Sequence, residues 1–371
     1  MQVLVVNAGS SSLKLRLLDA DDALLAQRDL PASLGRTDEG VLTAALAELP
    51  APDAIGHRVV HGGACHAAAV RLDAGVLDDL HALSDLAPLH QPPALEAQAL
   101  VARALPGLPS VACFDTAFHA TLPAAAATYA LPRTWRERWP LRRYGFHGLS
   151  HAYAARRAAQ LLGQPIEKLR VVSCHLGAGA SLCAIAGGSS VDTTMGFTPL
   201  EGLVMATRSG SVDPGLLLWL LEHGGQDPGA VAHALEHESG LLGLAGTADM
   251  REVLARAQQG EHAATLALDV YVHRLRAGIA AMAVALDGLD TLVFTGGVGE
   301  HAPVLRARAA AGLGLLGVAL DDARNAASDS DGDIGAPGAQ VRTVVVTARE
   351  DLEIAREVRA LLRRSSGPGG A

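Results

Sequence analysis

Lysine is scarce in this chain, and positive charge as a whole is outnumbered by negative charge. Of the 30 basic residues only Lys14 and Lys168 are lysines, and the formal net charge is −9. Proteins that bind nucleic acid need a basic face opposite the phosphate backbone, so this composition argues against a nucleic-acid partner. A local cationic pocket for a small anion remains compatible with it. Biased genomic composition explains the arginine preference, and against that background Lys14 is a candidate functional residue.

Cysteine pairs, a signal sequence and long apolar runs are also missing. Cys65, Cys113, Cys174 and Cys183 form no CxxC pair, and three of them lie in apolar, strand-like runs typical of buried thiols in a cytoplasmic protein. The chain enters a strand pattern at once, without the basic and apolar regions of a signal peptide. No apolar run is long enough to span a bilayer. We therefore expect a cytoplasmic protein without a membrane partner.

Two common nucleotide-binding motifs do not occur. The absence of GxxxxGK[ST] excludes a P-loop NTPase, and no GxGxxG opens a βαβ unit with a ribose-binding acid after it, which argues against a dinucleotide enzyme. A chain of 371 residues with 49% apolar residues is long enough and apolar enough for two domains with cores of their own. A nucleotide site would need another architecture.

The pattern of strands and turns is present twice. Residues 1–19 are predicted to form a strand, a Gly/Ser turn and a strand, with the apolar run VLVV typical of a strand buried on both faces. Residues 169–194 repeat that order, and HLGAGAS from His175 aligns with NAGSSS from Asn7 at an offset of 168 residues. The rest alternates between helix and strand patterns. This predicts an α/β protein with mixed sheets and a fold-level duplication, with a ligand cleft between the halves.

The other predicted elements follow from periodicity and turn residues. Strands are predicted at 53–63, 109–116, 290–295 and 341–347. Helices are predicted at 38–49, 74–86, 94–105, 213–223, 228–238, 249–259, 262–287 and 350–364. A Pro-rich loop is expected to separate the second and third helices. A Gly-rich turn and then the start of a helix are expected to follow the strand at 290, within residues 290–303. The helix at 262–287 is apolar on most faces and is expected to be buried.

The first turn has the composition of a phosphate cradle. Glycine and small hydroxyl residues let backbone N–H groups approach phosphate oxygens, Asn7, Ser10 and Ser12 add side-chain donors, and Lys14 adds a charge. The same residues also suit a tight β-hairpin with no ligand, so the turn alone leaves both interpretations open.

Two arginines lie in settings that favour anion binding. Arg58 lies in GHRVVHGG, at the end of a predicted strand. Arg208 lies in MATRSGSVDPG, before a predicted helix. A planar guanidinium group binds carboxylate or phosphate with two hydrogen bonds, although most of the 28 arginines are expected to be surface residues.

The segment RRYGFHGLSHAY contains His147 and His151 at the i,i+4 spacing of some zinc sites. The HExxH motif requires glutamate after the first histidine, and this chain has Gly148 there, which also indicates that His147 precedes the helix. His147 could donate to an anionic group in transfer, and the alternative is a capping or core histidine.

Two acids each follow a predicted strand. Asp115 lies in CFDTAFH and Glu350 in AREDLEIA. Such a pair can hold Mg²⁺ through a few oxygens and waters beside substrate phosphates. Taken alone, Glu350 is also explained as an acid at a helix N-terminus.

Nine motifs in register, almost from end to end of the chain, together resemble the acetate kinase family. They are NAGSSSLK (7–14), GHRVVHGG (56–63), LAPLHQPP (86–93), FDTAFHATLP (114–123), RRYGFHGLSHAY (142–153), HLGAGAS (175–181), TTMGFTPLEGLVMATRSGSVDPG (193–215), SGLLGLAGTADMRE (239–252) and FTGGVGEH (294–301). That family belongs to the superfamily of acetate and sugar kinases, actin and heat-shock chaperone ATPases.

The resemblance implies two duplicated actin-like (ribonuclease H-like) domains whose mixed sheets are flanked by helices, with a cleft between them. It implies one domain at 1–117 with 352–371 and a nucleotide-binding, dimer-forming domain at 118–351. It further implies a homodimer, ATP or ADP as co-substrate, and Mg²⁺, with Mn²⁺ as an alternative. The implied reaction is reversible, direct in-line phosphoryl transfer from ATP to acetate, giving acetyl phosphate and ADP.

The resemblance also implies roles for individual residues. The catalytic residues are Arg58, Asp115, His147 and Arg208, of which His147 and Arg208 stabilise the transition state. Asn7 and Glu350 belong to the metal site. The acid is bound by Arg58 and by a small pocket of Val60, Leu89, Phe146 and Pro199. ATP is bound by Ser10, Ser12, Lys14, His175, Leu176, Gly177, Ala178, Gly179, Asp249, Met250, Arg251, Gly297, Val298, Gly299, Glu300 and His301.

This chain departs from the family pattern at four positions and leaves two alternatives open. Ala178 and His301 replace common asparagines, Arg349 replaces another, and Asp351 replaces a glutamate. None removes a principal charge, so we expect activity. One alternative is a propionate or butyrate kinase, because a pocket discriminates by only about 1–3 kcal/mol per methylene. The other is a non-catalytic ATP-binding member of the superfamily, which would be expected to lack Arg58, His147 or Arg208.

Overall fold

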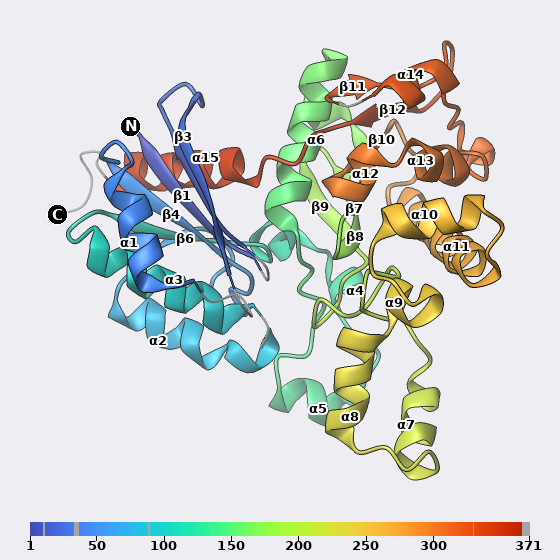
Figure 1. The fold of residues 1–371 in the computed structure, drawn as a ribbon, viewed down its shortest axis with the longest axis horizontal. Coiled ribbons are helices and arrows are strands. Elements are labelled where there is room, and N and C mark those ends of the chain that lie inside the picture. The colour runs from blue at the N-terminus through green and yellow to red at the C-terminus, as the bar shows by residue number, and fades with distance from the viewer. Residues whose placement is uncertain (10–11, 33–36, 88–89, 329, 366–371) are drawn as a thin grey trace. The chain divides into compact units, whose positions relative to one another are not determined.

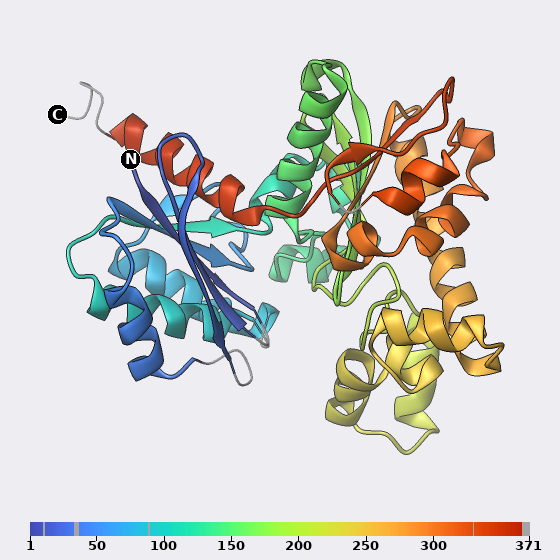
Figure 2. The ribbon, with the colours of Figure 1, turned by 45° about the horizontal axis from the view of Figure 1, so that its top comes forward.

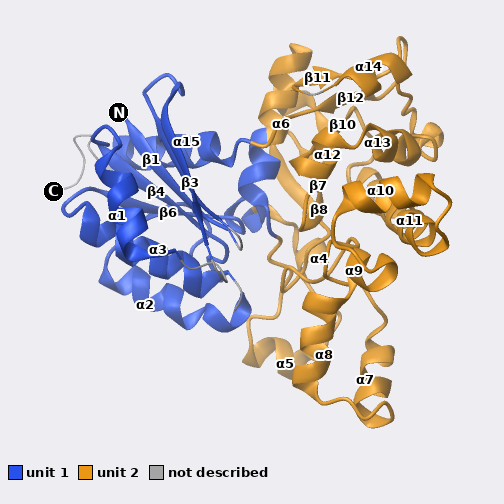
Figure 3. Ribbon diagram, viewed as in Figure 1, with its two compact units in different colours: residues 1–120, 146–153, 349–371 blue, residues 121–145, 154–348 orange. Residues whose placement is uncertain are grey.

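The computed structural model describes residues 1–9, 12–32, 37–87, 90–328 and 330–365 (Figure 1). The chain divides into two compact units (Figure 3). Unit 1 comprises residues 1–120, 146–153 and 349–371, and unit 2 comprises residues 121–145 and 154–348. The domain boundaries at 117/118 and 351/352, and the cleft between the domains, stay predictions.

Unit 1 is built on a six-stranded mixed sheet with the order β3-β2-β1-β4-β6-β5. Its strands are β1 (Val3–Ala8), β2 (Ser12–Leu18), β3 (Leu24–Pro31), β4 (Ala54–Val59), β5 (Val70–Arg71) and β6 (Ser110–Phe114). Strands β1, β4 and β6 run parallel, and β2, β3 and β5 pair antiparallel with their neighbours. Its helices are α1 (Glu39–Ala47), α2 (Ala74–Ala82), α3 (Gln91–Ala104), α15 (Glu350–Ser365) and the short η1 (Ser84–Leu86).

The alternation of side chains along β1 sends apolar residues to both faces of this sheet. Val3 and Val5 pack with α15, and Leu4 and Val6 pack with α1 and α3 on the other face. Figure 2 shows the red helix α15 and the blue-to-cyan helices on opposite faces of the blue strands. All four residues are almost completely buried. Burial on both faces explains why VLVV is a continuous apolar run.

Unit 2 contains a second six-stranded sheet, with the order β11-β12-β10-β7-β8-β9. Its strands are β7 (Arg170–Leu176), β8 (Ala180–Ala186), β9 (Ser189–Thr193), β10 (Thr291–Thr295), β11 (Gly332–Asp333) and β12 (Arg342–Val345). Its longer helices are α6 (Gly148–Leu162), which begins in unit 1, α7 (Pro214–Glu222), α10 (Met250–Gln258), α11 (His262–Ala285) and α13 (Pro303–Ala310). Its shorter helices are α4 (Ala124–Ala127), α5 (Arg133–Arg138), α8 (Pro228–His233), α9 (Gly240–Ala245), α12 (Gly296–His301) and α14 (Asp322–Ala327), and one π-helical turn covers Ala234–Glu238.

The two sheets have the same topology, which confirms the predicted duplication. Strands β7, β8, β9, β10, β12 and β11 repeat the pairing of β1, β2, β3, β4, β6 and β5, including which pairs are parallel. Strand β8 begins and ends 168 residues after β2, the offset that the two turns indicated. The predicted α/β fold with two similar mixed-sheet domains is therefore confirmed.

Three local predictions were wrong. Helix α3 begins at Gln91, so Pro92 and Pro93, the last two prolines of the expected loop, lie in its first turn, where a missing N–H costs nothing. The predicted helix start after β10 is present, but helix α12 begins at Gly296 directly after the strand, without the Gly-rich turn expected between them. Helix α11 is buried along one face only, since Leu266 and Val284 are 46% and 78% exposed.

Within the described residues, none of the helices combines the length and the apolar character that a bilayer crossing requires. None of the four cysteines takes part in a disulfide in that part of the chain; Cys113, Cys174 and Cys183 are buried, and Cys65 is exposed.

Candidate active site

Four predicted site residues meet at one edge of the sheet of unit 1. Strands β1, β4 and β6 are parallel neighbours, so their carboxyl ends lie at the same edge. Asn7 lies near the end of β1, Arg58 near the end of β4, and Asp115 directly after β6. Glu350 is the first residue of α15. The residues come from four distant parts of the sequence, and the sheet order brings them together.

Arg58 is the centre of this cluster. Its Nε and Nη2 donate to the two carboxylate oxygens of Asp115, at 3.1 and 2.6 Å. Its Nη1 donates to Asn7 Oδ1 at 3.2 Å and lies 3.9 Å from Glu350 Oε2. Asn7 Nδ2 donates to Glu350 Oε2 at 2.9 Å. The guanidinium group therefore has one orientation, set by two carboxylates and one amide.

Burial and the neighbouring charges shift the pKa values of Arg58 and Asp115 in opposite directions. Burial lowers the pKa of Arg58, but the carboxylates of Asp115 and Glu350 outweigh it, so the pKa of Arg58 is raised. Burial raises the pKa of Asp115, and the two hydrogen bonds from Arg58 oppose that rise. Removing either partner would leave an unpaired buried charge, which is the costly change in such pairs.

His147 lies directly before α6 and has a left-handed backbone, with φ of 57°. The prediction that it precedes the helix is confirmed. Such a backbone is uncommon for a residue with a side chain, and it persists only where the surroundings hold it. Here the next residue, Gly148, donates its N–H to the Asp115 carbonyl at 2.8 Å. A Cβ on Gly148 would lie 2.3 Å from that same oxygen.

His119 holds the residue on the other side of His147. Its Nε2 lies 3.0 Å from the Phe146 carbonyl oxygen, which can only accept, so Nε2 carries the proton. Burial lowers the pKa of His119 to about 4, so the ring is neutral near pH 7. Neither His119 nor Gly148 was a predicted site residue, although both lie inside the quoted motifs; Gly148 indicated only that His147 precedes the helix.

The zinc alternative finds no support in the geometry. The rings of His147 and His151 are 6.5 Å apart between centroids. No group of three or more His, Cys, Asp or Glu side chains suited to a metal occurs among the residues that the structure describes.

Most of the candidate nucleotide residues lie in unit 2, whereas Ser12 and Lys14 lie in β2 of unit 1. His175 and Leu176 end β7, and the turn that follows is closed by a hydrogen bond from Gly177 N to Gly179 O, at 2.9 Å. The carbonyl of Ala178 accepts from Ala206 N at 3.0 Å. The backbone of this turn is thus tied to the loop that carries Arg208, whatever the side chain at position 178.

The other nucleotide candidates differ in exposure. Asp249 caps α10, and its ion pair with the exposed Arg251 lowers its pKa to about 2. Glu300 is buried and accepts from Ala348 N at 3.0 Å, while His301 is exposed. Gly297, Val298 and Gly299 lie in α12, and Met250 is buried.

Arg208 lies in the loop after β9. Its Nη1 donates to the Pro199 carbonyl at 3.2 Å. Burial lowers its pKa, an effect that the Glu236 carboxylate opposes. Val60 and Phe146, from the predicted acid pocket, are buried in unit 1. Ser10 and Leu89 lie outside the described residues.

The oxygen atoms of the Asn7, Asp115 and Glu350 side chains are of the kinds that bind a magnesium ion. Mg²⁺ prefers carboxylate and amide oxygens, and it uses only one or two carboxylates when phosphates and waters complete its shell. Arg58 occupies both oxygens of Asp115, so Glu350 is the better candidate for direct contact. Asn7, which donates to Glu350 Oε2, would orient that carboxylate.

Comparison with known proteins agrees with this fold. Residues 38–356 match the acetokinase family. Two acetate kinases, from Gloeobacter violaceus and Bacillus mycoides, are 44% and 41% identical to this chain, covering 98% and 96% of it and 100% and 98% of their own length. A crystal structure of acetate kinase from Porphyromonas gingivalis superposes with a TM-score of 0.88 at 34% identity, over 97% of this chain and 99% of that one. A crystal structure of a propionate kinase from Francisella tularensis superposes with a TM-score of 0.87 at 36% sequence identity, over 96% of this chain and 98% of that one.

The duplicated mixed-sheet units define the actin-like fold of the superfamily that contains the acetate and sugar kinases. Within that class the match extends over most of the chain and over nearly the full length of the relatives. The chain belongs to the acetokinase family.

Proposed function

We propose that this chain catalyses reversible phosphoryl transfer between ATP and acetate, giving acetyl phosphate and ADP. The observation that carries the proposal is the cluster of Asn7, Arg58, Asp115 and Glu350 next to His147. It contains a cation held in one orientation and oxygen donors suited to Mg²⁺, which are the parts that phosphoryl transfer requires. The names of the similar proteins support the choice of acid.

The chemistry is one displacement at phosphorus. A carboxylate oxygen of acetate attacks the γ-phosphorus of ATP, the new P–O bond forms, and the bond to the β,γ-bridging oxygen breaks to release ADP. The attacking oxygen is already anionic, so no general base is needed. The protein has to position the two anions and offset their repulsion.

Arg58 supplies positive charge in a fixed direction. Because Asp115 takes two of its N–H groups, the remaining edge of the guanidinium group is directed by the protein before any substrate binds. His147 is held by its neighbours on both sides and would donate to an oxygen of the transferring group. The role of Arg208 in stabilising the transferring group is proposed from the family resemblance alone. Mutation of Arg208 therefore tests the proposal independently of the Arg58 cluster.

Metal and nucleotide residues complete the proposal. Glu350, oriented by Asn7, would hold Mg²⁺ (or Mn²⁺), and when bound the metal supplies charge neutralisation at the phosphate oxygens. The nucleotide-binding role of Lys14, Ser12, the His175–Gly179 turn, Asp249–Arg251 and Gly297–His301 is proposed from the family motifs. The same applies to Ser10.

The acid pocket is proposed to contain Val60, Leu89, Phe146 and Pro199. Acetate is the first choice and propionate a secondary substrate, since a methylene changes binding by only about 1–3 kcal/mol. The similar protein from Francisella tularensis is described as a propionate kinase, which supports that secondary activity.

We also propose that the protein is a cytoplasmic homodimer. Helix α7 is strongly apolar, yet none of its residues is buried. An exposed apolar face of this kind favours burial against a second copy. Cysteines without disulfides agree with a reducing compartment.

One assay tests the activity. Incubation with ATP, Mg²⁺ and a series of short-chain acids, followed by hydroxylamine trapping, should yield acyl hydroxamate with acetate and less with propionate. Arg58→Ala and Arg208→Ala should each lower kcat by about two to three orders of magnitude. Arg28→Ala, which removes an exposed arginine paired with Glu48, is the matched control.

Two outcomes would contradict the proposal. Wild-type turnover in both arginine variants would exclude the assigned site. ATP binding without any acyl phosphate would favour the non-catalytic alternative.

A further inference from the structure

One irregular loop carries both Pro199 and Arg208. It runs from Thr194, after β9, to Ser211, before α7, and has no helix or strand of its own. The proposed function needs this loop in one position, because Pro199 lines the acid pocket and Arg208 acts on the transferring group. The interactions that hold the loop therefore bear directly on catalysis.

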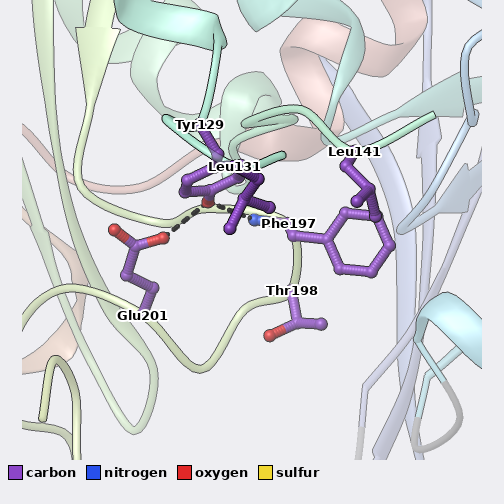
Figure 4. A pocket seen from close by; sticks show the side chains of 6 residues that line it. All are labelled: Tyr129, Leu131, Leu141, Phe197, Thr198 and Glu201. Atoms are coloured by element: carbon purple, nitrogen blue, oxygen red, sulfur yellow. Dashed lines mark hydrogen bonds between the residues drawn. The ribbon is translucent and has the colours of Figure 1, made fainter. Parts of the chain in front are cut away.

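The hydroxyl group of Tyr129 bridges two points of the loop. It donates to Glu201 Oε2 at 2.6 Å and accepts from the backbone N–H of Phe197 at 2.9 Å. Figure 4 shows the hydroxyl oxygen between these two partners. Burial and the Glu201 carboxylate raise the pKa of Tyr129, so the hydroxyl keeps its proton. One side chain from outside the loop thus fixes the spacing between residues 197 and 201.

Arg143 contacts the same loop at three further points. Its Nη1 donates to the carbonyls of Thr194 and Met195, at 3.1 and 3.0 Å, and its Nη2 donates to Glu201 Oε1 at 2.8 Å. The guanidinium carbon also lies 5.5 Å from the centre of the Tyr129 ring. Both oxygens of Glu201 are therefore used, one by Arg143 and the other by Tyr129.

Gly196 shows how closely these groups approach the backbone. Its carbonyl accepts from Tyr144 N and Gly145 N, at 3.0 and 3.3 Å. A Cβ on Gly196 would lie 1.8 Å from Glu201 Oε2 and 2.1 Å from Tyr129 Oη. Any side chain at this position would displace the hydrogen-bonding groups, so the network requires glycine there.

Part of this loop borders open space. A cavity of about 290 Å³ lies beside the network, lined by Tyr129, Leu131, Leu141, Phe197, Thr198 and Glu201 (Figure 4). Side chains that border open space gain few van der Waals contacts there. Loss of the two hydrogen bonds made by the Tyr129 hydroxyl group should therefore let this part of the loop move.

The far half of the loop is tied to the near half. Gly202 N donates to Ser211 Oγ at 3.1 Å, and Ser211 N donates to the Gly202 carbonyl at 3.0 Å. Arg208 Nη1 donates to the Pro199 carbonyl. A shift of Glu201 is thus transmitted through its neighbour Gly202 to the segment around Arg208.

We propose that Tyr129, Arg143 and Glu201 are positioning residues that set the place of Pro199 and Arg208, and with it the rate and the acid specificity of transfer. The inference rests on the proposed roles of Pro199 and Arg208. All these residues belong to unit 2. Tyr129, Arg143 and Glu201 are not proposed to touch the reacting atoms.

Tyr129→Phe is the first test, because it removes only the hydroxyl group. It should lower kcat/KM for acetate by roughly 10- to 100-fold, the range expected for a small misplacement of reacting groups. The ratio of kcat/KM for acetate to that for propionate should fall as well, while the thermal midpoint changes little. Tyr271→Phe, which removes a buried hydroxyl with no hydrogen-bond partner among the described residues, is the matched control and should behave as wild type.

A double-mutant cycle separates positioning from general stability. Tyr129→Phe and Glu201→Gln break the same network, so their effects on kcat/KM should be far from additive. The inference is overturned if both single variants keep wild-type kcat/KM and wild-type acid selectivity while Arg208→Ala is inactive. If Arg208→Ala is also fully active, the proposed function fails instead, so the two failures are distinguishable.

Discussion

At the scale of single residues, the Arg58 cluster divides its two acids between different tasks. Asp115 is bound to Arg58 by two hydrogen bonds, whereas Glu350 receives its hydrogen bond from Asn7 and lies 3.9 Å from the guanidinium group. The first acid orients a cation, and the second is available to a metal. Substitutions at the two positions should therefore produce different kinetic signatures.

Glu350→Gln should raise the Mg²⁺ concentration needed for half-maximal rate by at least about 10-fold, because it removes the carboxylate that we propose binds the metal. The rate measured as a function of Mg²⁺ concentration checks this. Asp351→Asn is the matched control: it removes an acid from the same first turn of α15, so it has a similar effect on the helix dipole but none on the metal. Equal Mg²⁺ dependence in both variants would contradict a metal role for Glu350.

Gly148→Ala should destabilise the protein by about 1–3 kcal/mol, as overpacking in a tight site does. The new Cβ would meet the Asp115 carbonyl oxygen at 2.3 Å and Phe118 Cβ at 2.8 Å. Turnover should fall too, since Asp115 and His147 would both be displaced. Gly314→Ala, at a glycine with nothing within 4 Å of the added methyl group, is the control. Unfolding in urea and kcat are the measurements, and a variant equal to wild type in both would refute the argument.

At the scale of elements, α7 is a helix whose apolar side chains are left largely uncovered by the rest of the described chain. Leu218 and Trp219 are 58% and 55% exposed, although the helix is among the most apolar segments of the sequence. Its N-terminus is well formed, with Asp213 as the cap and Pro214 in the first turn. A stable helix with an uncovered apolar surface is the main structural reason to expect self-association.

Leu218→Glu should weaken the dimer by at least about 10-fold in Kd, because a central apolar contact is worth about 2 kcal/mol or more. Sedimentation velocity over a range of protein concentrations measures it. Leu315→Glu changes a leucine that is 86% exposed in another part of unit 2 and should leave the association unchanged. A monomeric wild-type protein, or a Leu218→Glu variant that still dimerises as wild type does, would exclude α7 as the interface.

At the scale of the whole molecule, buried histidines link stability to pH. Burial lowers the pKa of His57, His61 and His119 to about 4, from an ordinary value of 6.5. The unfolded chain therefore binds more protons than the folded chain between pH 4 and 6.5. Stability from these groups is fully present above pH 6.5 and is lost as the pH falls toward 4.

Each such histidine should contribute a loss of about 2 kcal/mol between pH 7 and pH 5. His57→Leu should flatten this dependence, because neither ring nitrogen of His57 has a hydrogen-bond partner among the described residues, so the substitution breaks no hydrogen bond there. His273→Gln, at an exposed position, should not change the slope. Urea unfolding at several pH values is the measurement. An unchanged slope in His57→Leu would show that this histidine does not titrate as described.

Much of the fold was predictable from local sequence. The run VLVV, the alternating leucines of β2 and the two Gly-rich turns indicated the duplicated hairpins, because strand and turn preferences act over a few residues. Predicted helix boundaries were wrong where a residue type is favoured both in loops and in helices. The prolines before Ala94 indicated a loop, yet proline is also favoured in the first turn of a helix.

The candidate site was predictable only in part. The sequence predicted Arg58, Asp115 and Glu350 as site residues, but not the ion pair that joins the first two. Tyr129 lies outside the motifs altogether, and its link to Glu201 spans 72 residues. Contacts at that separation leave no local pattern in composition or periodicity.

The sequence by itself determined the two duplicated sheets, the family motifs and the residue types needed for phosphoryl transfer, because these depend on local backbone preference and on side-chain chemistry. Only the tertiary structure decided that Asn7, Arg58, Asp115 and Glu350 form one hydrogen-bonded cluster. It also decided which residues hold the loop of Arg208. The reason is that strand order places the ends of β1, β4 and β6 side by side, and strand order is settled by the packing of the whole unit.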